Sequence, residues 1–269
     1  MNYIQSIILG FVEGLTEFFP ISSTGHMILI ASIMGILEKK ITNLFLISVQ
    51  LGAIFSVFFM YRKKLFYQKY DFYLKIFLAI IPIGIFGFML NRIIYIFLES
   101  PIIVSISLLL GGVIIIKSEN LYKKNYFYKR NYITYFNAFV IGLCQCFSLI
   151  PGFSRSATTI IAGLLQNINR KETVEFSFFL SIPVIGMATC KKLHDYFFQL
   201  NYIDFRIFFH DMKLLLVGNI ISFITGVISI KFFIKYLQKY NFKLFGYYRI
   251  ILGVFFILIH YFVKPLRKF

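Results

Sequence analysis

The sequence predicts an all-α polytopic membrane protein with six transmembrane helices and two re-entrant helical hairpins. Hydrophobic residues make up 59% of the 269-residue chain and charged residues only 14%, whereas soluble domains average about 45–50% and about 25%. The 35 Phe and 18 Tyr residues also carry far more apolar surface than a disordered chain exposes to water. A single membrane domain covering 1–269 fits this length.

Six apolar runs are long enough to cross the hydrocarbon core of a bilayer, which takes about 20 residues. Their interiors are almost free of charge, and Glu175, Lys231 and Arg249 lie close to the ends of their runs. We expect one transmembrane helix from each of the runs 42–61, 72–90, 101–117, 173–190, 214–235 and 244–263.

Two further apolar regions, 2–36 and 133–168, are each too long for one span and too polar for two. Each is interrupted at its centre by a segment rich in Pro, Ser and Gly, from Pro20 to His26 in the first and from Pro151 to Ser156 in the second. Irregular backbone at membrane depth is tolerated only where it is buried in protein or lines a wet cavity. We therefore interpret both regions as re-entrant helix–break–helix hairpins.

The two halves of the chain, about 1–117 and 133–263, resemble each other. At a nearly constant spacing Gly10 pairs with Gly142, Glu13 with Gln145, Pro20 with Pro151 and Ser22 with Ser154. One hairpin plus three spans is an odd number of crossings, so the second half is predicted to be inverted relative to the first. In folds of this kind broken helices meet near the midplane and mark the binding site.

Clusters of basic residues between the spans predict the orientation. The densest clusters, such as Arg62 to Lys64, lie in segments that share one side of the predicted topology, and we assign that side to the cytoplasm. The cytoplasmic segments are then 62–71, 118–132, 169–172 and 236–243, and the outer ones are 37–41, 91–100, 191–213 and the C-terminus. The bias is modest because Lys191 and Lys192 fall outside. No continuous basic face explains the net charge of +17, so no nucleic-acid partner is expected.

The first hairpin carries two acids, Glu13 and Glu17, that are one helical turn apart and project from one face. An intramembrane acid is by default a functional candidate. Two like charges at this spacing repel unless a proton or cation relieves them, and divalent ions prefer carboxylate oxygens. The simpler interpretation is that both acids only bond to the neighbouring hairpin.

Hydroxyls and an imidazole follow at the first break, where Ser22, Ser23 and Thr24 precede His26. A hydroxyl close to an imidazole suits a nucleophile–base pair or a base that activates water. The structural alternative is that a serine caps the next helix and the histidine only packs.

The second break supplies Arg155 among the hydroxyls of Ser154, Ser156 and Thr159. An arginine at membrane depth requires an anion, and its planar fork suits phosphate oxygens. Helix N-termini at both breaks would direct N–H groups at that anion. The alternative is an ion pair between Arg155 and one of the glutamates, which we regard as part of the resting state.

We expect the other polar residues in or near the apolar runs to stabilise the fold and not to take part in catalysis. We expect Glu175 to support the fold, Gln50 and Gln145 to link helices, and Asp211 to be solvated in the outer segment 191–213.

The stretches from Glu13 to His26 and from Pro151 to Thr159 resemble the two signature motifs of the bacterial undecaprenyl-diphosphate phosphatase family, the bacitracin-resistance proteins. Glu175 to Phe178 is similar to a third shared stretch, so the resemblance covers essentially the whole chain. Ala157 stands where the family has a glycine, a change that removes no functional group.

The resemblance implies hydrolysis of undecaprenyl diphosphate to undecaprenyl phosphate and inorganic phosphate, which recycles the lipid carrier for peptidoglycan synthesis and confers bacitracin resistance. It also implies a divalent cation, Mg²⁺ or Ca²⁺, and a place in the bacterial inner membrane with the active site facing the outer, periplasmic side. The expected partners are the polyprenyl diphosphate lipid and membrane lipid, and a homodimer is left open.

Residues and resemblance together assign roles to the polar side chains of both breaks. Catalysis is expected of Glu17, Ser23, His26 and Arg155, phosphate binding of Ser22, Ser154, Arg155, Ser156 and Thr159, and metal binding of Glu13 and Glu17. His26 would act as base either for Ser23, giving a phosphoseryl intermediate, or for a water molecule, and the sequence does not choose between them.

Two other functions use some of the same residue types. The lipid-phosphate phosphatase superfamily requires a His-Asp pair soon after its arginine, whereas no histidine follows Arg155 until His194, so this class is rejected. A carrier or flippase for the lipid phosphate would use the arginine and the acids, but it has no use for a hydroxyl beside an imidazole.

Overall fold

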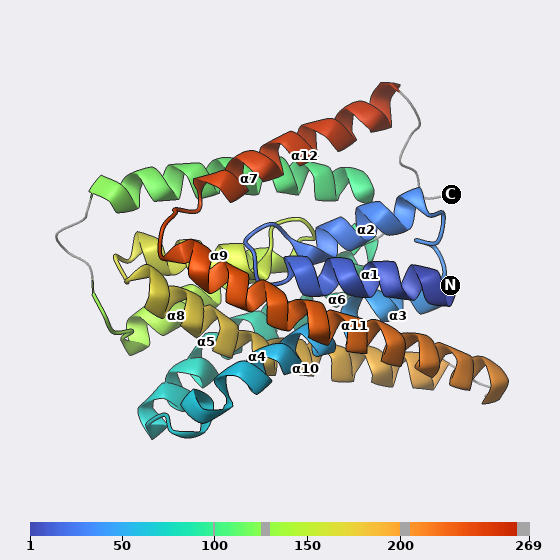
Figure 1. Ribbon diagram of the computed structural model, residues 1–269, viewed down its shortest axis with the longest axis horizontal. Coiled ribbons are helices and arrows are strands. Elements are labelled where there is room, and N and C mark those ends of the chain that lie inside the picture. The colour runs from blue at the N-terminus through green and yellow to red at the C-terminus, as the bar shows by residue number, and fades with distance from the viewer. Residues whose placement is uncertain (99, 125–129, 200–204, 263–269) are drawn as a thin grey trace.

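The computed structural model describes residues 1–98, 100–124, 130–199 and 205–262 (Figure 1). Within these residues the chain is helical and has no β-strand. The helices are α1 (Tyr3–Thr16), α2 (Ser23–Ile33), α3 (Lys40–Ser48), α4 (Gln50–Phe66), α5 (Tyr70–Met89), α6 (Asn91–Leu98), α7 (Pro101–Lys124), α8 (Tyr135–Gln145), the 3₁₀ turn η2 (Cys146–Leu149), α9 (Arg155–Leu165), α10 (Arg170–Gln199), α11 (Phe205–Leu237) and α12 (Lys243–Phe262).

Six helical stretches of the described chain are long and apolar enough to cross a membrane, which confirms the predicted class. They are Lys40–Phe66, Tyr70–Met89, Pro101–Lys123, Arg170–Tyr196, Phe208–Leu237 and Lys243–Phe262. Large apolar side chains such as Phe55, Phe88 and Ile251 lie exposed on their outer faces, as lipid-facing residues do. The chain is a polytopic all-α membrane protein.

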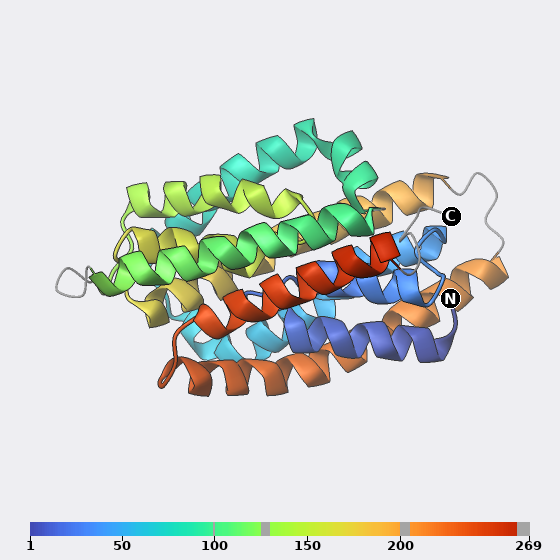
Figure 2. The same cartoon turned by 90° about the horizontal axis from the view of Figure 1, so that it is seen from above.

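Most helices run along one long axis and form a bundle (Figures 1 and 2). The main pairings join α7 to α12, α1 to α11, α11 to α4 and α5 to α8. The start of α1 and the end of α12 lie at the same end of this bundle (Figure 1).

Two glycines bring the first helix of each hairpin close to a spanning helix. A Cβ atom on Gly10 of α1 would lie 2.5 Å from the Gly218 carbonyl oxygen of α11, and one on Gly142 of α8 would lie 2.4 Å from the Ala79 carbonyl oxygen of α5. Small residues permit this backbone approach between membrane helices. These two glycines are partners in the predicted repeat, so both halves use the same packing device.

The two hairpins lie in opposite halves of the bundle. The pair α1–α2 occupies the half that holds the N-terminus, the pair α8–α9 occupies the other half, and their breaks meet near the middle (Figure 1). Backbone at the first break is enclosed, since Phe18 to Ser23 are all buried. The re-entrant interpretation and the inverted repeat stay predictions, and this arrangement agrees with both.

The segments 91–100 and 191–213, which join predicted spans on the outer side, contain more helix than the apolar runs predict. The first contains α6, and in the second α10 continues to Gln199 while α11 begins at Phe205. The extra turns are amphipathic, because Leu193, Tyr196 and Met212 pack against the buried cluster that contains Leu37 and Phe45. Amphipathic periodicity supports a helix beyond the apolar run that crosses the membrane.

The run 42–61 is also more complex than one helix, because α3 ends at Ser48 and α4 begins at Gln50. The backbone continues through Val49 with helical dihedrals (φ −67°, ψ −18°), so the two pieces form one spanning stretch. Gln50 comes to lie at this junction beside the first break.

Candidate active site

The first break places an acid and two serines between α1 and α2. Glu17 follows α1 directly, and its backbone N–H donates to the Glu13 carbonyl oxygen at 2.9 Å, so the two acids are one turn apart as predicted. Ser22 caps α2 by accepting a hydrogen bond from the Gly25 N–H at 3.2 Å. Ser23 is then the first residue of α2.

The second break repeats this construction. Ser154 caps α9 by accepting from the Ala157 N–H at 3.2 Å, and Arg155 is the first residue of that helix. Ser22 and Ser154 also share a left-handed backbone conformation, with φ of 70° and 71°. Non-glycine residues rarely adopt it, and such strain gathers at functional sites.

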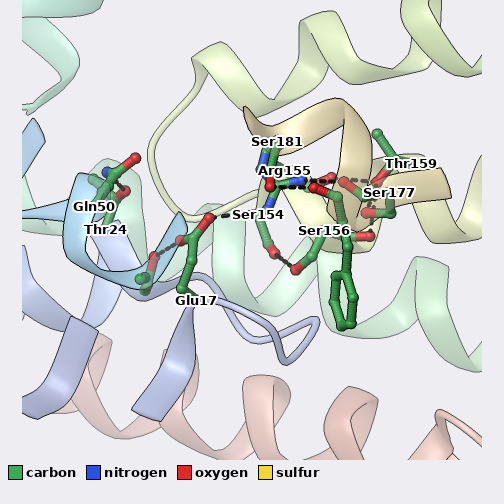
Figure 3. A network of polar contacts seen from close by, with 12 residues as sticks. Glu17, Thr24, Gln50, Ser154, Arg155, Ser156, Thr159, Ser177 and Ser181 are labelled. Carbon is green, nitrogen blue, oxygen red and sulfur yellow. Dashed lines mark hydrogen bonds and ion pairs between the residues drawn. The ribbon is translucent and has the colours of Figure 1, made fainter. Parts of the chain in front are cut away.

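An ion pair and a hydrogen bond join three of the predicted catalytic residues across the breaks. Arg155 donates from Nη2 to Glu17 Oε1 at 3.0 Å, and the Ser23 hydroxyl donates to Glu17 Oε2 at 2.5 Å. Both side chains of the ion pair are about nine-tenths buried. Glu17 is thus held between the Ser23 hydroxyl of its own break and the Arg155 guanidinium of the second break (Figure 3).

Arg155 is oriented from behind by α10. Its Nη1 donates to the Ser177 carbonyl oxygen at 2.9 Å, and the Ser177 hydroxyl lies 2.7 Å from that of Thr159 (Figure 3). Thr159 also donates to the Arg155 carbonyl oxygen at 2.9 Å. Arg155 Nε, in contrast, is a buried donor with no hydrogen-bond partner in the described chain.

Ser156 ties the second break to the first, because its hydroxyl donates to the Phe19 carbonyl oxygen at 2.9 Å. The Ser154 hydroxyl lies 3.0 Å from that of Ser156. These contacts fix the backbone around the ion pair. All three serines predicted to bind phosphate, Ser22, Ser154 and Ser156, therefore already form hydrogen bonds within the two breaks.

His26 is turned away from Ser23. Its Nδ1 lies 2.7 Å from the Ser22 carbonyl oxygen, an acceptor, so Nδ1 carries the proton and donates. Its Nε2 then accepts from the Tyr248 hydroxyl at 2.8 Å, and the two rings stack with centroids 5.6 Å apart. The predicted serine–histidine pair is therefore not formed here, because both ring nitrogens hold other partners.

Glu13 is fully buried, and neither carboxylate oxygen has a hydrogen-bond partner in the described chain. Among the described residues no group of three or more His, Cys, Asp or Glu side chains could hold a metal ion. The fit with a divalent ion rests on the two orphaned oxygens of Glu13 beside Glu17. An ion such as Mg²⁺, which keeps water and substrate oxygens as its other ligands, suits so small a protein donor set.

A cavity of about 180 Å³ opens between the breaks and is lined by Glu17, Ser23 and Arg155, among others. Ser22, Ser154 and Ser156 line it as well, whereas Glu13, His26 and Thr159 do not. An apolar pocket of about 350 Å³ adjoins it and shares the side chains of Ile47, Ile83 and Ile94. This pocket reaches Lys191 and Asp195, so the polar cavity continues into an apolar groove.

The residues given structural roles have mixed outcomes. Gln50 links α4 to α2 by donating to Thr24 Oγ1 at 3.1 Å (Figure 3), as expected, and Glu175 pairs with Lys64 of α4. The expectation for Gln145 is wrong, because neither amide atom has a hydrogen-bond partner in the described chain. Asp211 is buried rather than solvated and accepts from Tyr196, since the outer segment is helical.

Sequence reasoning missed Tyr248 and Arg249, both on α12. Arg249 is completely buried and contacts the backbone of both breaks. A charged residue inside an apolar run is by default a functional candidate. Arg249 was set aside because it lies near the end of its run. No feature of the sequence marked Tyr248 as the partner of His26.

Comparison with known proteins agrees with this geometry over almost the whole chain. Residues 6–255 match the family model described as bacitracin resistance protein BacA. An undecaprenyl-diphosphatase of Flavobacterium psychrophilum is 46% identical over 267 residues, which cover 99% of each chain. One of Persephonella marina is 45% identical over 96% of this chain and 99% of its own, and one of Methanococcus aeolicus is 40% identical over 98% and 100%. Both breaks and the start of each of the six spanning stretches lie within the matched region. The chain therefore belongs to the BacA family of bacitracin resistance proteins.

Proposed function

We propose that this protein is an undecaprenyl-diphosphatase, which hydrolyses undecaprenyl diphosphate to undecaprenyl phosphate and inorganic phosphate. The observation that carries the proposal is the Ser23 hydroxyl held 2.5 Å from the Glu17 carboxylate, which itself lies 3.0 Å from Arg155 at the cavity between the breaks. A hydroxyl, a base and a phosphate-binding cation are the groups that phosphate transfer to a side chain needs. The names of the relatives support the same substrate.

Ser23 is the nucleophile in this proposal, and Glu17 is its base. Ser23 Oγ forms a bond to the terminal phosphorus while the bond from that phosphorus to the bridging oxygen breaks, and undecaprenyl phosphate leaves. The hydroxyl proton passes to Glu17. Water then attacks the phosphoseryl phosphorus and releases inorganic phosphate, and the proton returns from Glu17 to Ser23 Oγ. Glu17 takes the place that sequence reasoning gave to His26, because it is the group in contact with the hydroxyl.

Arg155 stabilises the charge that spreads over the transferred phosphoryl group. This task is mostly electrostatic, and it needs preorganised donors. The contact with Ser177 fixes the guanidinium from behind, and its unpartnered Nε–H is available to a phosphate oxygen. When the diphosphate enters, it takes over part of the ion pair with Glu17, and this frees the carboxylate to accept the proton of Ser23.

Glu13, together with Glu17, would hold the divalent cation. Two buried oxygens without partners in the described chain are the reason for placing it there. When bound, the cation supplies positive charge to the oxygens of the diphosphate. Because its oxygens have no hydrogen-bond partner in the described chain, the contribution of Glu13 in this proposal is to retain the ion.

His26 orients the first break. Its contacts with the Ser22 carbonyl oxygen and the Tyr248 hydroxyl hold the residue that precedes the nucleophile. The alternative, in which His26 is the base for water, requires the ring to leave one of these partners. We assign it a positioning role on this geometry.

The lipid chain lies in the apolar groove that continues from the cavity, and the protein works in the bacterial inner membrane with its site open to the outer side. Support for the orientation comes from the basic cluster Arg62 to Lys64, which ends α4, while the groove reaches Lys191 and Asp195 of α10. Positive residues favour the cytoplasmic side, and the predicted topology puts residue 191 on the other side.

The decisive test is release of inorganic phosphate from undecaprenyl diphosphate by the purified protein in detergent. We expect wild-type activity, its reduction to background in Ser23→Ala, and near-normal activity in the matched control Ser229→Ala, a buried serine of α11 without a hydrogen-bond partner in the described chain. Binding of the lipid without any phosphate release would contradict the proposal and favour the carrier. Full activity of folded Ser23→Ala would favour direct attack by water.

A further inference from the structure

Arg249 of α12 is the largest fully buried side chain in the described structure. A guanidinium has five N–H donors, and here each of the five is matched by one backbone carbonyl oxygen. Nε donates to Leu108 at 3.3 Å, Nη1 to Pro20 at 3.2 Å and Phe153 at 3.1 Å, and Nη2 to Ser107 at 3.3 Å and Gly152 at 2.7 Å. One side chain thus contacts three separate parts of the chain.

These acceptors include both breaks. Pro20 lies three residues before Ser23, and Phe153 lies two before Arg155. Carbonyl oxygens outside a helix must find donors when they are buried at membrane depth. Arg249 supplies such donors to both breaks at once. Through the Ser107 and Leu108 carbonyl oxygens it also links both breaks to α7.

The seat of this guanidinium is closely fitted. A Cβ atom on Gly111 of α7 would lie 1.9 Å from Arg249 Nη2, so any other residue at position 111 displaces the guanidinium. Gly152, whose carbonyl oxygen accepts from Nη2, has φ of +100°, and a Cβ atom there would lie 2.6 Å from the Val104 carbonyl oxygen, so the second break also lies close to α7. The absence of a side chain at Gly111 leaves the space that the guanidinium fills.

Arg249 forms no ion pair with any carboxylate of the described residues. If the surroundings of Arg249 served only to compensate its positive charge, an acidic side chain would be expected beside it. Its donors are instead spent on backbone at the two loops that carry the reacting side chains, which is the arrangement of a support for a site.

We propose that Arg249 is a positioning residue that fixes the separation of the two breaks and thereby the geometry of Ser23, Glu17 and Arg155. This inference rests on the proposed function. An error of about 1 Å in the placement of reacting groups costs on the order of 10²-fold in rate. Loss of the five-carbonyl contact should therefore lower kcat, whereas KM, which depends largely on the lipid chain, should change little.

The test compares three variants by phosphate release and thermal unfolding. Arg249→Lys keeps the charge but has three donors at one point, and Gly111→Ala keeps the arginine but moves it. Gly253→Ala is the matched control, because its Cβ would meet the Ser105 carbonyl oxygen at 2.7 Å in the same α7–α12 interface without touching Arg249. The first two should lose about 10²-fold in kcat with KM within about threefold, and the control should lose stability and keep kcat.

Amide hydrogen exchange at residues 17–25 and 150–157 gives a readout that does not depend on activity. Exchange in both segments should rise in Arg249→Lys and in Gly111→Ala, and stay at the wild-type level in Gly253→Ala. If Arg249→Lys does not fold, Gly111→Ala decides the question, because it retains every donor.

Two results would overturn the inference: folded variants with wild-type kcat and exchange, or a Gly253→Ala protein that loses as much kcat as Gly111→Ala. Failure of the proposed function is distinguishable, because the wild type would then release no phosphate while the exchange pattern could still be measured.

Discussion

Glu17 and Arg155, 138 positions apart in the chain, form a buried ion pair whose N–O distance is 3.0 Å. Each comes from a different break, so the pair joins the two halves at the cavity. Breaking a buried pair by removing one partner is costly, because the remaining charge is left without compensation. The pair therefore links stability and activity, and mutations have to be analysed for both.

Arg155→Lys is expected to fold and to lose about 10²–10³-fold in turnover, the usual cost of one preorganised donor. Lysine keeps the charge for Glu17 but cannot also donate to Ser177 and to a phosphate oxygen from a planar fork. Phosphate release at matched folded levels, with thermal unfolding alongside, measures this. Arg170→Lys, at the ion pair with Glu119, is the control and should retain turnover. Near-normal turnover of folded Arg155→Lys would show that the arginine only neutralises the acid.

Removal of divalent ions is expected to abolish phosphate release. Glu13→Gln should require at least about tenfold more metal for half-maximal activity, because even the loss of an outer-shell partner of a metal ligand costs about 10–100-fold in metal affinity. The reason is that Glu13 has two buried oxygens without partners in the described chain. Activity titrated with Mg²⁺ and Ca²⁺ after chelation measures the effect, and Glu175→Gln, whose acid pairs with Lys64, serves as control. A wild type that is fully active in chelator would exclude a required cation.

Ser154→Gly is expected to be more stable than Ser154→Ala. Both lose the hydroxyl that caps α9, but only alanine has to carry a Cβ in the left-handed conformation with φ of 71°. The difference should be about 1–2 kcal/mol. Thermal or denaturant unfolding of the two variants measures it, and the same order is expected for Ser22→Gly against Ser22→Ala. Equal stabilities of the two variants would mean that the backbone at position 154 leaves the positive-φ conformation once the capping hydroxyl is removed.

Labelling from outside the cell is expected to reach a cysteine at position 38 and not one at position 63. Glu38 and Lys63 are both exposed, and the predicted topology places them on the outer and cytoplasmic sides. A membrane-impermeant maleimide, applied to intact cells carrying Glu38→Cys or Lys63→Cys in a chain without native cysteines, measures accessibility. Permeabilised cells should label both. The reverse pattern in intact cells would place the site on the cytoplasmic side.

The spanning helices and the two breaks could be predicted because each has a strong local signal. A run of about 20 apolar residues reports a span, and Pro, Gly and Ser inside an apolar region report an interruption. The ends of α10 and α11 could not be predicted by this rule, because their outer turns are amphipathic and stay folded by packing against residues such as Leu37.

Within the site, the sequence predicted which residues converge but not which atoms meet. Glu17, Ser23 and Arg155 do come together. The partner of His26 is Tyr248, more than two hundred positions away, and a spacing of three residues from Ser23 could not reveal that contact. The preference of the ring for the Ser22 carbonyl oxygen depends on the backbone of the break, which is fixed only in the folded protein.

The five-carbonyl seat of Arg249 also imposes an order on biogenesis. α12 leaves the ribosome after every other helix of the described structure, and its guanidinium enters hydrocarbon at high cost unless acceptors are already in place. The acceptors exist only once α7 and both breaks have come together, so we expect α12 to dock last and to complete the maturation of the protein. A chain that stops at residue 242 should insert its earlier spans yet leave the segments around Pro20 and Gly152 open to proteolysis, and protection of both segments in that chain would show that they mature without it.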